Sequence, residues 1–220
     1  MDIDTFNQCL LYMQANTKNS FDAYLGIAGT LAGTGFGFWL NHWVTGKKEK
    51  RTETAKKDCC VRDIQELKSI CGYSSKEVSV LVADLATKKR PKAHSLPSNV
   101  KLILLEKMYP EIASSFSADQ QIWIKLIFRY IDDINEGLRA INDSPSEKSL
   151  YKISKTLVNL LTSLHDVFKV TLCVLENKEI ELPSIETMML QSGANKSSIL
   201  AYRTLVLNIQ RDDALLGLDR

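Results

Sequence analysis

No Asp, Glu, Lys or Arg occurs between Ala23 and Gly46, although charged residues make up 25% of the whole chain. A helix rises about 1.5 Å per residue, so roughly 20 residues cross a hydrocarbon core about 30 Å thick. The missing charges therefore predict that residues 23–46 form one transmembrane helix. A loop in a soluble protein is the alternative, because each glycine in a helix interior costs about 1 kcal/mol relative to alanine.

Motifs that carry known chemistry are also missing. The run from Gly33 to Gly37 fits neither GxGxxG nor GxxxxGK[ST], the frames of nucleotide-binding loops. The five cysteines include no C-x-x-C pair, which disfavours a zinc site or a disulfide framework. We therefore expect no metal and no cofactor, and we expect that the protein is not an enzyme.

Glycine is concentrated in the uncharged stretch, because five of the ten glycines lie between Gly26 and Gly37. A helical wheel places small residues on one face: Gly26, Gly29, Thr30, Gly33 and Gly37. In lipid, small residues four positions apart let two helices approach closely and associate. This face predicts a homo-oligomer formed through the span. Tolerated packing in a passive span is the alternative.

Aromatic and basic residues flank the uncharged stretch. Tyr24 at one end and Trp39 and Trp43 at the other are typical of interfacial belts. The basic residues expected at the membrane surface follow the span: Lys47, Lys48, Lys50 and Arg51. Because positive flanks stay on the cytoplasmic side, we expect a single-pass protein of the cell membrane with its N-terminus outside. The basic run is either this topological signal alone or also a contact for anionic headgroups.

The sequence divides into four predicted segments. Residues 1–22 form an outward-facing amphipathic segment, residues 23–46 the span, residues 47–57 a basic juxtamembrane linker and residues 58–220 a cytoplasmic helical domain. The chain carries 28 basic and 26 acidic residues, and the two kinds balance once the first three segments are set aside. A neutral domain disfavours a dedicated nucleic-acid binder.

Apolar residues recur at helical spacing throughout the cytoplasmic part, which predicts an all-α bundle of about six or seven helices. The first of these helices is expected to run from Asp58 to a C-cap at Gly72, and the second to begin at a capping box at Ser74–Glu77. The third is expected from Ser98 to about Pro110, and the fourth begins at a capping box at Ser117–Gln120. The fifth is expected from Ser144–Pro145 to about Glu176, and two further helices follow Pro183 and Gly193. The apolar stretch from Leu157 to Leu175 contains His165, Asp166 and Lys169. These polar residues favour a buried central helix over a second span.

Three groups of residues are candidates for chemistry. A positive loop that could bind an anion comprises Lys88, Lys89, Arg90, Lys92 and Lys101, and a solvated helix end is its simpler interpretation. Asp132, Asp133 and Glu136 are expected to pair with Arg129 and Arg139 rather than to bind a metal. His165 is conceivable as a general base, but no nucleophile accompanies it.

The order of one N-terminal span, a basic run and a small helical domain resembles the small membrane-anchored effectors of bacterial antiviral systems, CRISPR-associated or abortive-infection. The resemblance is one of layout, since Arg90 and His94 miss the Arg-to-His spacing of one helical ribonuclease family. It implies a pore-forming or membrane-disrupting effector that the cytoplasmic domain regulates. The alternatives are an anchored adaptor that recruits a cytoplasmic protein and, third, a tethered enzyme acting on a nucleotide or RNA at the basic loop.

Overall fold

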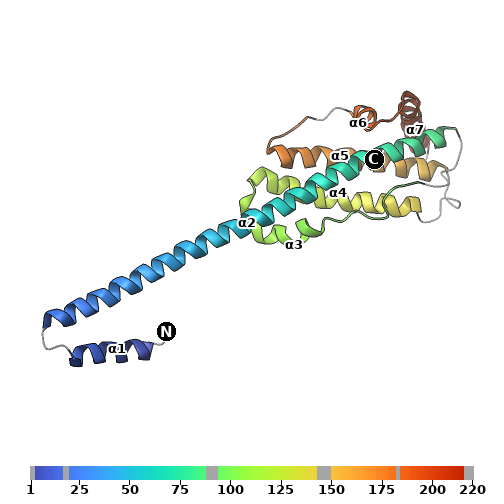
Figure 1. Ribbon diagram of the computed structural model, residues 1–220. Helices are drawn as coiled ribbons and strands as arrows, with labels where there is room; N and C mark the ends of the chain where they lie inside the picture. The colour runs from blue at the N-terminus through green and yellow to red at the C-terminus, as the bar shows by residue number, and fades with distance from the viewer. Residues whose placement is uncertain (1–2, 17–19, 88–93, 143–149, 182–183, 216–220) are drawn as a thin grey trace. The chain divides into compact units, whose positions relative to one another are not determined.

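The computed structural model describes residues 3–16, 20–87, 94–142, 150–181 and 184–215 (Figure 1). Within these residues the chain forms helices and no strand, which confirms the predicted all-α fold. The elements are α1 (Ile3–Asn16), α2 (Ser20–Ala86), α3 (Ile103–Ile112), the 3-10 helix η1 (Ala113–Ser115), α4 (Ala118–Asn142), α5 (Leu150–Glu176), α6 (Ile185–Gln191) and α7 (Lys196–Leu215).

The chain divides into two compact units, Met1–Thr54 and Ala55–Arg220. The first unit contains α1 and the first part of α2, and the second contains the rest of α2 with α3 to α7. α1 is helical, and its Leu11 and Tyr12 are exposed.

The second unit is a helical bundle with one core. α2 contributes a stripe of buried apolar residues at helical spacing, with the buried Ser74 and Ser75 between Cys71 and Val78: Cys60, Ile64, Leu67, Cys71, Val78, Leu81, Val82 and Leu85. This spacing keeps one face of a helix turned toward its neighbours. Helical spacing predicts that eight apolar residues of this segment face inward. Six of them are buried, namely Ile64, Leu67, Val78, Leu81, Val82 and Leu85, whereas Val61 and Ile70 are partly buried. The predicted buried central position of α5 is confirmed, because its Leu157, Leu160, Leu161 and Leu164 are at most 1% exposed.

The α4 and α5 helices are in extensive contact and run side by side (Figure 1). They are antiparallel, because Gln120 at the start of α4 donates from Nε2 to the carbonyl oxygen of Val174 near the end of α5, at 2.8 Å. The predicted capping box is confirmed, since the Ser117 N–H donates to Gln120 Oε1 and the Gln120 N–H donates to Ser117 Oγ. These bonds satisfy N–H groups that a helix start leaves without partners.

The predicted helix break between Gly72 and Ser74 is wrong, because α2 continues without interruption to Ala86. Ser75 and Ser79 donate instead to the carbonyl oxygens four residues earlier, at 2.7 and 2.6 Å. One glycine costs a helix only about 1 kcal/mol. That is less than the apolar burial that the continuous helix gains on both sides of the glycine.

The predicted limits of the third helix are also wrong. α3 begins at Ile103 rather than after Ser98, and the Asp63 carboxylate of α2 accepts from the N–H groups of Leu104 and Leu105. The helix also continues through Pro110 to Ile112 before it tightens into η1. The predicted start at Ser144–Pro145 lies outside the described residues.

The extended segment before α3 is held by a side chain of α4. Asn135 accepts from the Val100 N–H at 2.7 Å and donates to the Val100 carbonyl oxygen at 2.9 Å. An amide can form both bonds at once because it carries a donor and an acceptor side by side. Asn135 therefore acts on Val100 as a neighbouring β-strand would, and it fixes the chain that leads into α3.

Candidate functional site

The glycine face of α2 is open in the first unit. A Cβ atom placed at Gly29, Gly33 or Gly37 would meet no heavy atom within 4 Å. The hydroxyl of Thr30 donates to the Gly26 carbonyl oxygen at 2.7 Å, so it is satisfied within the helix. The described residues of the chain thus give these glycines no packing role, although glycine weakens a helix. The face remains available to another helix.

Aromatic side chains form a stacked column on α2. The ring centroids of Phe36 and Trp39 are 5.8 Å apart, and those of Trp39 and Trp43 are 6.5 Å apart. Lys47 continues the column, with Nζ 3.7 Å from the centroid of Trp43. All three rings are at least half exposed. The predicted interface residues Trp39 and Trp43 therefore belong to one surface, and Tyr24 is exposed nearer the start of the helix.

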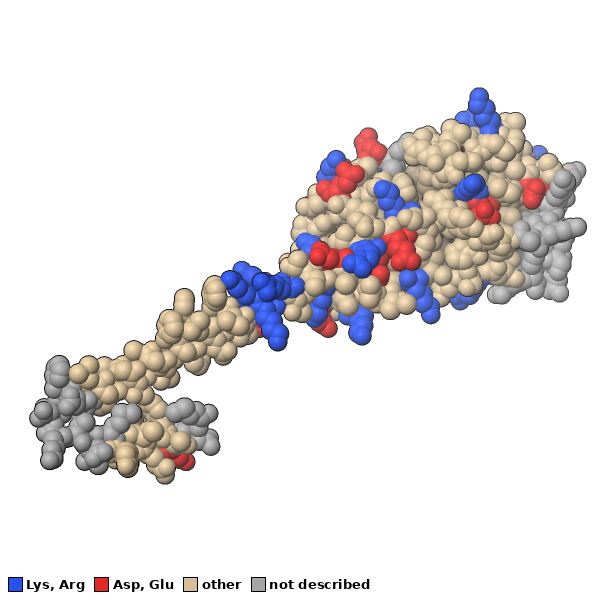
Figure 2. Space-filling view, in the orientation of Figure 1, with Lys and Arg blue, Asp and Glu red and all other residues tan. Residues whose placement is uncertain are grey.

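Basic side chains gather on α2 directly after the uncharged stretch, where Figure 2 shows a blue cluster following a tan surface. The four residues predicted to lie at the membrane surface are all exposed: Lys47, Lys48, Lys50 and Arg51. Lys56 and Lys57 lie differently, within the second unit. Lys56 pairs with Glu111, and Lys57 donates to the carbonyl oxygen of Ser115 at 2.7 Å.

Among the described residues, Leu150–Glu176 is the one helix that is long and apolar enough to cross a membrane, by length and composition alone. Half of its most apolar stretch is buried inside the bundle, as in the core helix of a soluble domain. The uncharged part of α2 is less apolar, because glycine and threonine are less apolar than leucine or isoleucine. Its aromatic and aliphatic side chains, in contrast, are mostly exposed among the described residues.

The candidate anion-binding loop is described only at its edge. Lys88, Lys89, Arg90 and Lys92 lie outside the described residues, and Lys101 is exposed. His94, just after the loop, is half-buried, and its Nδ1 atom is buried without a hydrogen-bond partner among the described residues. The loop stays a prediction.

Two of the three acidic residues predicted to form ion pairs on α4, Asp133 and Glu136, line a hollow instead. Among the described residues, no ion pair within 4 Å involves Asp132, Asp133 or Glu136, so the predicted pairs with Arg129 and Arg139 are wrong. A hollow of about 400 Å³ lies between α4 and α5, lined by Asp133, Glu136, Gly137, Ala140, Thr156, Asn159, Leu160, Thr162 and Ser163. No group of three or more His, Cys, Asp or Glu residues suited to a metal occurs in the described part of the chain.

His165 of α5 and two cysteines of α2 are further reactive groups. His165 is half-buried, and its Nδ1 atom is 3.3 Å from Asp166 Oδ1. Burial raises the pKa of the Cys71 thiol to about 12, and burial together with the charge of Asp63 raises that of Cys60 to about 11. Thiols with such pKa values are protonated at neutral pH and are weak nucleophiles.

Sequence reasoning missed a polar cluster that joins the start of α5 to the end of α7. Lys155 Nζ donates to both carboxylate oxygens of Asp213, at 2.8 and 3.0 Å, and the Tyr151 hydroxyl also bonds to Asp213. The bond to Lys155 lowers the pKa of Asp213, and the bond to Asp213 raises the pKa of Lys155. The YxxxK spacing put two of these residues on one helix face, but nothing in the sequence pointed to Asp213.

Comparisons with protein-family models, with curated proteins and with solved structures each found no match. The functional conclusion therefore depends on the residues of this chain.

Proposed function

We propose that this chain is a single-pass membrane protein that self-associates through the glycine face of α2, with the bundle of the second unit as its cytoplasmic regulatory domain. In this proposal residues 23–46 cross the membrane, residues 1–22 lie outside and the basic residues from Lys47 mark the cytoplasmic surface. Because the layout of the chain resembles that of membrane-anchored antiviral effectors, we further propose that assembly disrupts the membrane or forms a pore in antiviral defence.

The open glycine face carries the proposal. In water, five glycines between Gly26 and Gly37 make a poor helix, with a cost of about 1 kcal/mol each relative to alanine. Within lipid the backbone hydrogen bonds must be satisfied internally, which enforces the helix whatever its composition. Among the described residues, no heavy atom lies within 4 Å of a Cβ placed at Gly29, Gly33 or Gly37, and this open space supports close approach of a second helix at backbone distance.

Regulation by the second unit is supported by the continuity of α2. The helix that carries the glycine face also supplies core residues of the bundle, among them Ile64 and Leu67. A ligand or partner that changes the packing of the bundle would act on the same helix that assembles in the membrane. Such a ligand would shift the equilibrium between monomer and oligomer only if it bound the bundle of one form more tightly than that of the other.

An anchored adaptor is the second candidate, and the outer face of α7 favours it. Leu200 and Leu207 are each 65% exposed and lie seven residues apart on one face, with Leu190 of α6 49% exposed. Exposed apolar residues of this kind are typical of surfaces that bind a protein. An adaptor would use the bundle for recruitment and would not need the glycine face.

The test compares matched glycine variants of the full-length protein in detergent. Gly33→Leu/Gly37→Leu fills the proposed interface, whereas Gly35→Leu adds the same side chain about 180° away around the helix. A Cβ at any of these positions meets nothing within 4 Å, so no variant strains the chain itself. Light scattering corrected for bound detergent gives the mass of each protein.

We expect a discrete oligomer for the parent and for Gly35→Leu, and a monomer for the double variant. This result would justify measurements of ion conductance in planar bilayers. A monomeric parent, or an oligomer that both variants preserve, would contradict self-association through this face and leave the adaptor as the better account.

A further inference from the structure

The aromatic column of α2 is a defined surface with a chemistry of its own. Phe36, Trp39, Trp43 and Lys47 follow one another at spacings of three and four residues, which places them on one side of a helix. Their rings stack, and Lys47 closes the column over the outer face of Trp43. Phe36, Trp39 and Trp43 are 61%, 59% and 50% exposed, so no described residue of the first unit covers the column.

The dimensions of the column match one leaflet of a bilayer. Eleven residues separate Phe36 from Lys47, which corresponds to about 16 Å along a helix. Half of a hydrocarbon core is about 15 Å thick. If residues 23–46 cross the membrane, the three rings face the acyl chains of the leaflet next to the basic residues, and Lys47 reaches the headgroups.

The positive charges of Lys47 and Lys50 at the end of the column favour an anionic headgroup. Lys50 lies on the same side of the helix as Lys47, and the exposed lysines and arginine in this region outnumber the single Glu49. A choline group could bind an aromatic face by a cation–π contact. The face of Trp43 already carries the ammonium of Lys47, however, so a choline there would meet a like charge. A headgroup phosphate without a compensating cation is instead attracted by the ammonium groups of Lys47 and Lys50.

We propose that this column is a binding site for an anionic phospholipid, with one acyl chain along Phe36, Trp39 and Trp43 and the headgroup phosphate at Lys47 and Lys50. This inference rests on the proposed membrane span. A general interfacial belt would surround the helix and contact any lipid, whereas this site lies on one face of α2 and binds one class of lipid.

Tryptophan fluorescence tests the proposal in the full-length protein. The chain has three tryptophans, and a Trp123→Phe background leaves only the two in the column. Two sets of vesicles contain phosphatidylcholine and phosphatidylglycerol in the same ratio and differ only in which lipid carries brominated acyl chains. Bromine quenches tryptophan on contact, so the ratio of the two quenching efficiencies reports which lipid occupies the column.

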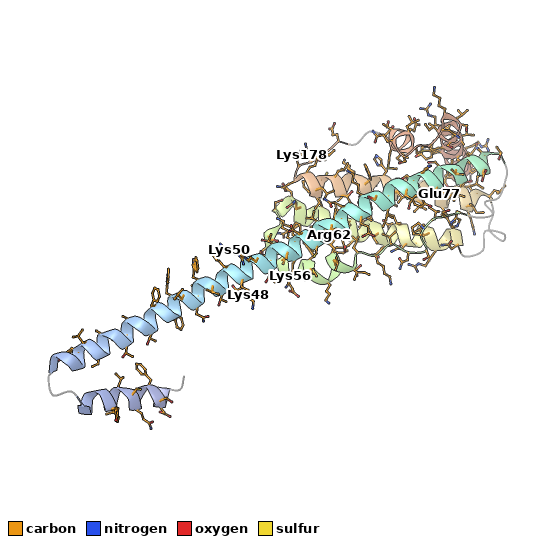
Figure 3. All side chains as sticks on the ribbon, in the orientation of Figure 1. Lys48, Lys50, Lys56, Arg62, Glu77 and Lys178 are labelled. Atoms are coloured by element: carbon orange, nitrogen blue, oxygen red, sulfur yellow. The ribbon has the colours of Figure 1, made fainter. Side chains whose placement is uncertain are left out.

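We expect brominated phosphatidylglycerol to quench more strongly than its share of the bilayer predicts. Lys47→Gln and Lys50→Gln should each reduce this preference by up to about fivefold, which is the effect of one basic residue at an anionic surface. Lys48→Gln is the matched control, because Lys48 is about 200° from Lys50 around the helix; both are labelled in Figure 3. It should leave the preference unchanged.

Three results would overturn the inference. Equal quenching per molecule by the two lipids would contradict a lipid preference while leaving the span in place. An equal effect of Lys48→Gln and Lys47→Gln would show diffuse attraction to the surface rather than a site on one face. No quenching by either lipid, in protein that fails to float with the vesicles, would overturn the span itself and this inference with it.

Discussion

The Asp63 carboxylate accepts a hydrogen bond from the backbone N–H of Leu104 at 2.8 Å, although 41 residues separate them in the sequence. The same oxygen accepts from Leu105 at 2.9 Å. At the other end of the same segment, Lys57 of α2 donates to the carbonyl oxygen of Ser115. Asp63 thus binds the start of α3, where helix N–H groups lack partners within the helix. Lys57 binds the end of η1, where carbonyl oxygens lack them. The helix dipole favours this placement of a negative charge at the start and a positive charge at the end.

Removing this acid should destabilise the bundle. Asp63→Ala leaves the N–H groups of Leu104 and Leu105 without a partner in a buried place, with a cost of about 2–4 kcal/mol. Asp63→Asn keeps an acceptor oxygen and should cost about 1 kcal/mol. Urea unfolding of the full-length protein in detergent measures both, with Trp123 as the reporter in a Trp39→Phe/Trp43→Phe background. Equal losses for the two variants would contradict a capping role.

Two helix glycines should respond to alanine in opposite directions. A Cβ atom added at Gly72 would meet nothing within 4 Å, so Gly72→Ala should stabilise the bundle by up to about 1 kcal/mol. At Gly137 the added Cβ would lie 3.3 Å from Leu160 Cδ1, which is tighter than an ordinary van der Waals contact, and Leu160 is only 1% exposed. Gly137→Ala should therefore be destabilising by about 1 kcal/mol. The same unfolding measurement compares them, and stabilisation by both would show that α4 and α5 are not packed this closely.

The segment before α3 should depend on the amide of Asn135. Asn135→Ala removes both bonds to the buried Val100 and should cost about 2 kcal/mol. Asn135→Asp keeps the acceptor but places a carboxylate oxygen against the Val100 carbonyl oxygen, so it should not restore stability. Limited proteolysis around residues 94–102 and urea unfolding give the two readouts. Asn159→Ala, at an exposed position of α5, is the control and should change neither.

The buried thiols should make the bundle sensitive to alkaline pH. The pKa values of Cys60 and Cys71 are raised to about 11 and 12, mainly because burial disfavours the thiolate. For a group whose pKa is raised by folding, the stabilisation is complete below the unfolded pKa and is lost as pH rises toward the folded value. Stability should therefore fall from about pH 9 upward. A Cys60→Ala/Cys71→Ala variant should lose less stability over this range than the parent.

The same two thiols should also resist alkylation. At pH 8 the exposed Cys9 should react with iodoacetamide at once, while Cys60 and Cys71 should react only on unfolding. Mass spectrometry of peptides identifies the labelled cysteines. Rapid labelling of Cys71 in the folded protein would contradict its burial.

Local patterns predicted the parts of the fold that local interactions decide. The helical spacing of apolar residues after Asp58 predicted which side of the chain is buried, because burial follows the period of the helix; Ile64, Leu67, Val78 and Leu81 all lie in the core. The capping box at Ser117 and Gln120 was predicted correctly since both of its hydrogen bonds join residues three apart. The absence of charge between Ala23 and Gly46 and the glycine face it contains are likewise readable without any structure.

Only tertiary structure decided where the helices end and what holds them. The sequence at Ser74 has the same form as a capping box, yet α2 continues there, because its residues on both sides of Gly72 pack into one core. The start of α3 depends on Asp63, and the segment before it depends on Asn135; both partners are distant in the sequence. A local pattern can favour a helix end. The chain nevertheless forms a continuous helix where the burial of apolar residues on both sides of that position is more stabilising than the cap.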